Sequence, residues 1–233
     1  MNMLYVVIVL AVFWLLWYLI NAIPYRNSSY YDATQRSFLS VFYDKGAYGE
    51  YLIYKRLRRF EDKGAMFLFN CYVPKSDDET SEVDVLMIYH SGIYVFESKN
   101  YGGWIFGSEN GKTWTQTLPN GKKARKEHFY NPIMQNRSHI IWLEKQVEET
   151  NLFHNIVVFS ERCEFKNLEI TNGNISVIKR HALQRIVESI DGKVGNRLDD
   201  DHIRMIYEKL YPYTQVSKET KEAHIERINK KYK

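Results

Sequence analysis

The 233-residue chain has few cysteines and little excess charge. Its two cysteines, Cys71 and Cys163, have no zinc-site spacing and give no indication of a disulfide framework, which argues against a disulfide-stapled secreted domain. A reducing compartment is therefore the default expectation. The formal net charge of only +4 is a mild bias towards an anionic partner and does not establish one.

Charge is absent from the N-terminal segment, where Met3 to Ile20 is an unbroken apolar and aromatic run. A helix rising 1.5 Å per residue would span about 27 Å over this run, close to the thickness of a bilayer core. The run lacks the basic region and small-residue cleavage site of a signal peptide. We therefore predict one transmembrane helix that contacts the membrane through residues 3–23 and ends at Pro24. The basic residues that follow it are Arg26, Arg36 and Lys45. The positive-inside rule therefore predicts that the rest of the chain lies in the cytoplasm.

A β-hairpin is predicted for Glu82 to Tyr101, where apolar and polar residues alternate on both sides of Ser91-Gly92. A two-residue loop at that point predicts the register His90 with Ile93, Leu86 with Glu97, and Asp84 with Lys99. Because strand side chains alternate faces, Asp84, Glu97 and Lys99 share one face. The hairpin thus brings two acids and one amine together.

Two interpretations of these charged residues are open. The simpler one is an ordinary cross-strand ion pair between Asp84 and Lys99. However, both faces of the hairpin are rich in apolar residues, which predicts a strand pair buried on both sides. Acids in such a place need partners or a metal ion.

A helix is predicted from Gly46 to Phe60, with Glu50 on its apolar stripe. A carboxylate near a helix start can simply be stabilised by the helix dipole while it faces solvent. The alternative is that Glu50 points inward as a third acid beside the hairpin.

Four sequence blocks resemble a known family: Gly46-x-x-Gly49-Glu50, Glu82-Val83-Asp84, Glu97-Ser98-Lys99-Asn100-Tyr101-x-Gly103 and Asn131-Pro132-x-x-Gln135-Asn136. Asp84 followed by Glu97-Ser98-Lys99 resembles the D...ExK core of the PD-(D/E)xK nuclease superfamily. The blocks together resemble the nuclease-related domain, NERD, over roughly Asp44 to Ser160. One departure is Val83, which stands where the superfamily name has proline.

This resemblance implies a fold, a cofactor and a reaction. The fold would be α/β, a PD-(D/E)xK nuclease-like mixed sheet flanked by helices and preceded by the transmembrane helix. Asp84, Glu97 and Glu50 would hold Mg²⁺ or Mn²⁺, which prefer oxygen ligands. Lys99 would position the attacking water and stabilise charge on the phosphate, and Gln135 would orient the water or a phosphate oxygen. The reaction would be phosphodiester hydrolysis in DNA or RNA, without a small-molecule cofactor.

Two further features have simple structural explanations as well as functional ones. Leu118 to Phe129 is predicted to be a basic loop that carries Lys122, Lys123, Arg125 and Lys126. The loop is either simply solvated or contacts the backbone of a nucleic acid. His139 lies on the same stripe as Gln135 in a helix predicted from Asn131-Pro132 to Thr150. We interpret His139 as a core histidine and not as a metal ligand.

The chain is expected to divide into five segments: a transmembrane anchor (1–24), a juxtamembrane linker (25–43), the nuclease-related domain (44–160), a C-terminal α/β extension of that domain (161–213) and a charged tail (214–233). The tail is expected to be either a weak helix or disordered. Further strands are expected at Met66 to Val73, Asn155 to Ser160 and Asn174 to Ile178, with helices at His181 to Ile190 and Asp200 to Tyr211. The predicted function is that of a membrane-anchored, metal-dependent nuclease. The alternative is a catalytically inactive module with the same fold that binds nucleic acid or a protein partner.

Overall fold

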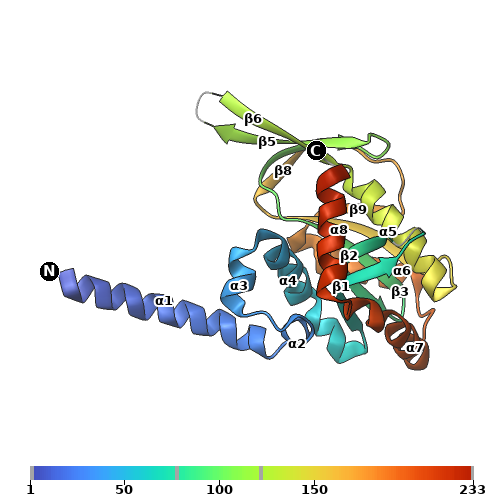
Figure 1. The fold of residues 1–233 in the computed structure, drawn as a ribbon, viewed down its shortest axis with the longest axis horizontal. Coiled ribbons are helices and arrows are strands. Elements are labelled where there is room, and N and C mark those ends of the chain that lie inside the picture. The colour runs from blue at the N-terminus through green and yellow to red at the C-terminus, as the bar shows by residue number, and fades with distance from the viewer. Residues whose placement is uncertain (1–2, 77–78, 121–122, 232–233) are drawn as a thin grey trace.

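The computed structural model describes residues 3–76, 79–120 and 123–231, which form a mixed α/β structure with two sheets (Figure 1). The first sheet has the order β1-β2-β3-β7-β9, with β1 Met66–Pro74, β2 Thr80–Tyr89, β3 Gly92–Lys99, β7 Phe153–Phe159 and β9 Ile175–Lys179. The second has the order β6-β5-β4-β8, with β6 Lys123–Tyr130, β5 Thr113–Asn120, β4 Gly103–Ser108 and β8 Cys163–Glu169. Strands β3, β7 and β9 run parallel, so their carboxyl ends meet at one edge of the first sheet.

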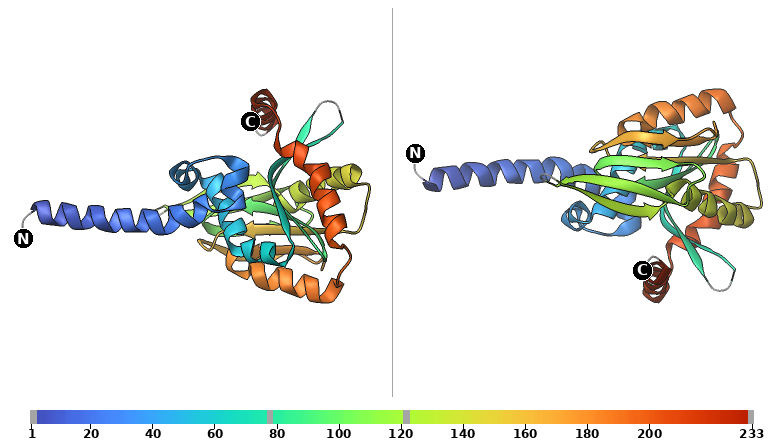
Figure 2. Two further views of the ribbon diagram at one scale, coloured as in Figure 1. Left: turned by 90° about the horizontal axis from the view of Figure 1, so that it is seen from below. Right: turned by 90° about the horizontal axis from the view of Figure 1, so that it is seen from above.

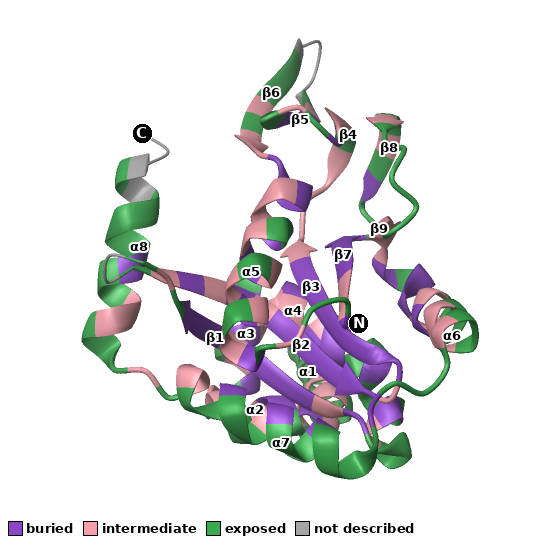
Figure 3. Ribbon diagram, turned by 90° about the vertical axis from the view of Figure 1, so that its right-hand side faces the viewer, coloured by how far each residue is buried: buried purple, intermediate pink, exposed green. Residues whose placement is uncertain are grey.

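Helices cover both faces of the first sheet. They are α1 Met3–Arg26, α2 Ser29–Thr34, α3 Phe38–Tyr43, α4 Lys45–Leu57, α5 Pro132–Val147, α6 Leu183–Val194, α7 Asp200–Leu210 and α8 Lys218–Lys231, with short 3₁₀ helices at Arg58–Lys63, Arg180–Ala182 and Tyr211–Thr214. Helices α2, α4 and α6 pack on one face, and α5 and α7 pack on the other. The central strands β2 and β3 are consequently buried on both sides (Figure 3), as their apolar sequence predicts.

The two helices that frame the site begin where their capping residues predict. The Asp44 side chain accepts hydrogen bonds from the N–H groups of Gly46 and Ala47 at the start of α4. Asn131 caps α5 in the same way, and Pro132 occupies its first turn. These caps fix where Glu50 and Gln135 lie along their helices.

The predicted hairpin exists, but its predicted register is wrong. The turn consists of His90 and Ser91, and Tyr89 pairs with Gly92. Leu86 therefore faces Val95, and continuation of the same register brings Asp84 level with Glu97 instead of Lys99. Gly92 is the first residue of β3 and has to be glycine there, because a Cβ atom at this position would lie 2.3 Å from the carbonyl oxygen of Leu152. The face assignment survives, since a shift of two residues keeps every side chain on its side.

The segment predicted as a juxtamembrane linker, residues 25–43, is part of the folded body. It contains α2 and α3, and it contributes buried side chains to the core: Tyr25, Tyr30, Phe38 and Val41. Helix α1 also continues two residues beyond the predicted end at Pro24. Most of α1 projects from the body with exposed apolar side chains (Figure 2), and it is long and apolar enough to cross a membrane.

The fold corrects one other prediction and decides between two alternatives for the charged tail. The predicted basic loop is a β-hairpin made of β5 and β6. The charged tail forms α8, whose buried His224 contacts the β1–β2 region: its Nδ1 lies 2.9 Å from the Thr80 hydroxyl, and its ring packs edge-on against Tyr72. The tail is thus placed beside the sheet (Figure 1) because one histidine anchors it there.

Candidate active site

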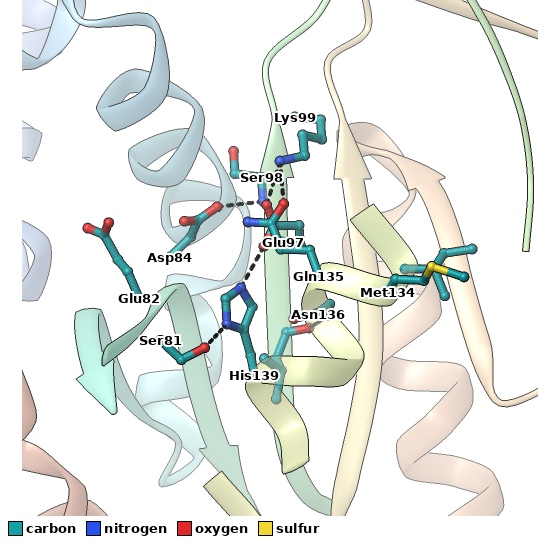
Figure 4. A network of polar contacts seen from close by, with 12 residues as sticks. Ser81, Glu82, Asp84, Glu97, Ser98, Lys99, Met134, Gln135, Asn136 and His139 are labelled. Atoms are coloured by element: carbon teal, nitrogen blue, oxygen red, sulfur yellow. Dashed lines mark hydrogen bonds and ion pairs between the residues drawn. The ribbon is translucent and has the colours of Figure 1, made fainter. Parts of the chain in front are cut away.

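The predicted acids and amine lie together at one edge of the first sheet. Strand β2 supplies Asp84, β3 supplies Glu97 and Lys99, α5 supplies Gln135, and α4 supplies Glu50. Figure 4 shows the side chains of the first four pointing towards one another. Elements that are far apart in sequence therefore converge on one cluster of charged and polar groups.

Lys99 is at the centre of this cluster. Its Nζ donates hydrogen bonds to Glu97 Oε1 at 2.6 Å and to Gln135 Oε1 at 3.1 Å. The lysine side chain is only 14% exposed, and that of Glu97 only 1%. Burial lowers the pKa of Lys99, but the negative charge of Glu97 outweighs it, so the pKa is raised overall. Lys99 is therefore a protonated amine that is held in place by two oxygen acceptors.

Glu97 has a second partner that the sequence did not identify. His139 Nε2 lies 3.2 Å from Glu97 Oε2, and its Nδ1 lies 2.6 Å from the Ser81 hydroxyl. Because a carboxylate only accepts hydrogen bonds, Nε2 donates to Glu97, and Ser81 is the hydrogen-bond partner of Nδ1. Burial alone would raise the pKa of Glu97, but Lys99 and His139 together lower it.

The prediction for His139 was therefore only partly adequate. The residue is a buried core histidine, as expected, but its hydrogen bond orients an active-site carboxylate. The available signal was its spacing of four residues from Gln135, which puts both on one helix face. That spacing fits a purely structural histidine equally well.

Asp84 and Glu50 are held less firmly than Glu97. The backbone N–H of Ser98 donates to Asp84 Oδ2 at 2.8 Å. Burial, followed by the negative charges of Glu97 and Glu50, raises the pKa of Asp84 well above its ordinary value. Burial, followed by the charge of Glu82, raises the pKa of Glu50 to about 8. The site therefore contains more acid than its one lysine can compensate.

Tyr30 also reaches this site from α2. Its hydroxyl donates to Glu50 Oε2 at 3.3 Å, so Glu50 faces the body of the protein and not solvent. The burial of Tyr30 contributes to the raised pKa of its own hydroxyl, which stays a donor. Glu50 therefore points inward, as the third-acid interpretation requires, and its charge acts on Asp84.

The chemistry of this donor set suits a hard divalent cation. Asp84, Glu97 and Glu50 offer carboxylate oxygens, and burial, followed by nearby negative charge, raises the pKa values of Asp84 and Glu50; a bound cation would oppose both effects. Among the residues that the structure describes, no three acidic, histidine or cysteine side chains already stand in a metal-binding arrangement. The fit therefore rests on the oxygen ligands that these acids offer and on the burial of Asp84 and Glu97, which leaves their charge poorly solvated.

Comparison with known proteins agrees with this geometry. Residues 45–160 match the family model of the nuclease-related domain, NERD. This part of the chain belongs to the nuclease-related domain family. An uncharacterized protein of Bacillus anthracis is 29% identical over 188 residues, which make up 81% of this chain and 85% of that protein. No solved structure matches the chain significantly.

The nuclease-related domain borders a cleft of about 630 Å³. Asp84, Gln135 and His139 line its inner side, and Tyr130 from β6 lines another part. Helix α8, which lies outside the family match, borders it with Arg227 and Lys230. The lining of the cleft therefore combines acidic side chains with basic side chains from α8.

Of the four basic residues predicted to contact nucleic acid, Lys123, Arg125 and Lys126 lie on strand β6 of the β5–β6 hairpin. Lys122 is outside the described residues, and Lys123 begins β6. Arg125 is exposed and forms an ion pair with Glu127 at 2.5 Å, while Lys126 is exposed opposite Thr117. Tyr130, four residues beyond Lys126, reaches the cleft, so Lys126 is about 13 Å further along the strand. Contact between these residues and a substrate remains a prediction.

Proposed function

We propose that this protein is a membrane-anchored, metal-dependent nuclease that hydrolyses phosphodiester bonds in DNA or RNA. The observation that carries the proposal is the position of Lys99, a buried amine joined to Glu97 and Gln135 and adjacent to Asp84. A bound Mg²⁺ or Mn²⁺ would polarise the scissile phosphate and lower the pKa of a water molecule. Asp84, Glu97 and Glu50 are the residues that would hold it.

The three N–H donors of Lys99 support a direct role in the reaction. Two hydrogen bonds go to Glu97 and Gln135, so among the described contacts one donor remains for a phosphate oxygen. Negative charge grows on those oxygens in the transition state, and a fixed cation stabilises it more than it stabilises the substrate. Lys99 is therefore suited to transition-state stabilisation.

Gln135 supports the same role through the orientation of its amide. Its Oε1 accepts from Lys99, which leaves its Nε2 group directed elsewhere as a donor. Because Gln135 also lines the cleft, this donor can orient a water or phosphate oxygen. The contact with Lys99 fixes which end of the amide performs that task.

Helix α1 is proposed to anchor this nuclease in a membrane, with the body on the cytoplasmic side. Its length, its apolar composition and its exposed side chains support the anchor. The basic residues that follow the span support the orientation.

The test is nuclease activity of the full-length protein in detergent with Mg²⁺ or Mn²⁺, against single- and double-stranded DNA and RNA. We expect cleavage by the wild type and a loss of about a hundredfold or more in Asp84→Asn and Glu97→Gln. Nucleic-acid binding without cleavage under every condition would instead support an inactive binding module. A protein that shows no binding and no cleavage of nucleic acid would instead support a protein-interaction role.

A second experiment tests whether α8 forms part of the substrate cleft. Replacing Arg227 and Lys230 by Gln removes two positive charges that line the cleft. Affinity for a single strand should therefore fall about tenfold, and the slope of log affinity against log salt concentration should become shallower by about 1.4. The charge-matched control is Lys193→Gln with Lys218→Gln, at exposed residues that do not line the cleft. Equal losses in both double variants would indicate a non-specific charge effect.

A further inference from the structure

A second pocket, of about 360 Å³, lies at the edge of the sheet where the parallel strands end. Asn100 follows β3, Ser160 follows β7, and Arg180 follows β9. In open α/β sheets the carboxyl ends of parallel strands are the usual place for ligands. Asn100 directly follows Lys99, so the backbone at the end of β3 is shared between this pocket and the candidate active site.

Asn100 organises the basic side chains of this pocket. Arg162 Nη2 donates to the Asn100 carbonyl oxygen at 2.7 Å and to Asn100 Oδ1 at 3.0 Å. Arg180 Nη2 donates to the same Oδ1 at 3.4 Å, and Asn100 Nδ2 donates to the Lys45 carbonyl oxygen at 2.7 Å. One residue thus positions two guanidinium groups and ties them to the start of α4.

The charges around the pocket do not balance. Lys45, Arg162 and Arg180 are positive and Glu161 is negative, so the lining carries three positive charges and one negative charge, a net +2. Arg180 has a side chain only 8% exposed, yet its ion pair with Glu161 is 3.5 Å long and Glu161 is 43% exposed. Burial, and the neighbouring charges of Arg162 and Arg56, lower the pKa of Arg180 despite Glu161. A buried cation in this setting needs a stronger anionic partner.

We propose that this pocket binds the terminal phosphate group of a nucleic-acid strand. A phosphate monoester carries close to two negative charges at neutral pH, which matches the net +2, whereas a phosphodiester carries one. Paired guanidinium groups also present several N–H donors in the geometry that phosphate oxygens accept. Arg162 and Arg180 both lie outside the family match, whereas Asn100, which positions them, lies inside it.

This inference rests on the proposed function, because it places the end of the same substrate strand beside Lys99. It is tested by measuring the binding of full-length protein in detergent and EDTA, which prevents metal-dependent cleavage. Three otherwise identical DNA strands are compared: one with a 5′-phosphate, one with a 3′-phosphate and one with hydroxyl groups at both ends. We expect one phosphorylated strand to bind about tenfold more tightly than the hydroxyl strand, which is the effect of about one charge-assisted hydrogen bond.

Two variants should change this preference in opposite directions. Arg162→Gln should abolish the preference while affinity for the hydroxyl strand stays the same, and its exposed position limits the risk of unfolding. Glu161→Gln should increase the preference, because it removes the only acid among the described residues that line the pocket. Arg185→Gln, at an exposed residue on α6 outside the pocket, is the charge-matched control and should leave the preference unchanged.

Equal affinity for the three strands, or a preference that survives Arg162→Gln, would overturn the proposal. Arg162-dependent binding to vesicles of phosphatidic acid, without a preference among DNA strands, would overturn it in favour of a lipid phosphate. The binding assay does not require cleavage. A protein that lacks nuclease activity but prefers a phosphorylated end would therefore contradict the proposed nuclease function and still support phosphate binding in this pocket. A nuclease without the preference would contradict only the pocket.

Discussion

Replacing Lys99 by Met distinguishes a catalytic lysine from a structural counter-ion. The substitution removes the charge and keeps most of the apolar stem. Glu97, which is only 1% exposed, would lose its 2.6 Å partner and keep the hydrogen bond from His139. Breaking a buried ion pair typically costs 3–5 kcal/mol, and the surviving partner favours the lower end, about 3 kcal/mol.

A divalent cation should largely restore this stability. A ligand present at 100 times its dissociation constant stabilises the folded state by about 2.7 kcal/mol, which is close to the expected loss. Metal-saturated Lys99→Met should therefore be folded, and any loss of activity can then be assigned to chemistry. If Lys99 stabilises charge in the transition state, cleavage should slow by about 10²- to 10³-fold while nucleic-acid affinity changes little.

The assay combines thermal unfolding with and without Mn²⁺ and single-turnover cleavage by the metal-saturated protein. Lys209→Met is a suitable control because Lys209 pairs with Glu148 on the surface, where both side chains are exposed. It should change stability by less than about 0.5 kcal/mol. Cleavage at the wild-type rate by folded, metal-saturated Lys99→Met would refute the catalytic role, and unchanged stability without metal would refute the buried-pair argument.

Three other predictions concern positions around the site. Gly49→Ala should lower the free energy of unfolding in urea by about 1–3 kcal/mol, because the new Cβ would lie 2.7 Å from Ser98 Oγ. Gly192→Ala is the control, since a Cβ there meets open space and should not destabilise the fold. His139→Asn should lower kcat more than it weakens substrate binding, because it frees Glu97 to rotate; equal kcat in the two proteins would contradict this positioning role. Protease added to intact spheroplasts should leave the body undigested, and digestion from outside would reverse the proposed topology.

Local patterns in the sequence were sufficient to predict most elements near the site. Asn131 and Pro132 identified the start of α5, because a cap acts within one helical turn. Alternation along β2 and β3 assigned Asp84, Glu97 and Lys99 to one face, because that assignment depends only on the period of a strand. The apolar N-terminal run predicted α1 by length and composition.

Contacts between distant segments decided the rest. The register of the hairpin depended on the close approach of Gly92 to Leu152. The role of His139 depended on its distance from Glu97. The folding of residues 25–43 depended on aromatic packing against the sheet. The position of α8 depended in the same way on the burial of His224 beside Tyr72. Local periodicity reports which face a side chain occupies, whereas these features depend on what another part of the chain places against that face.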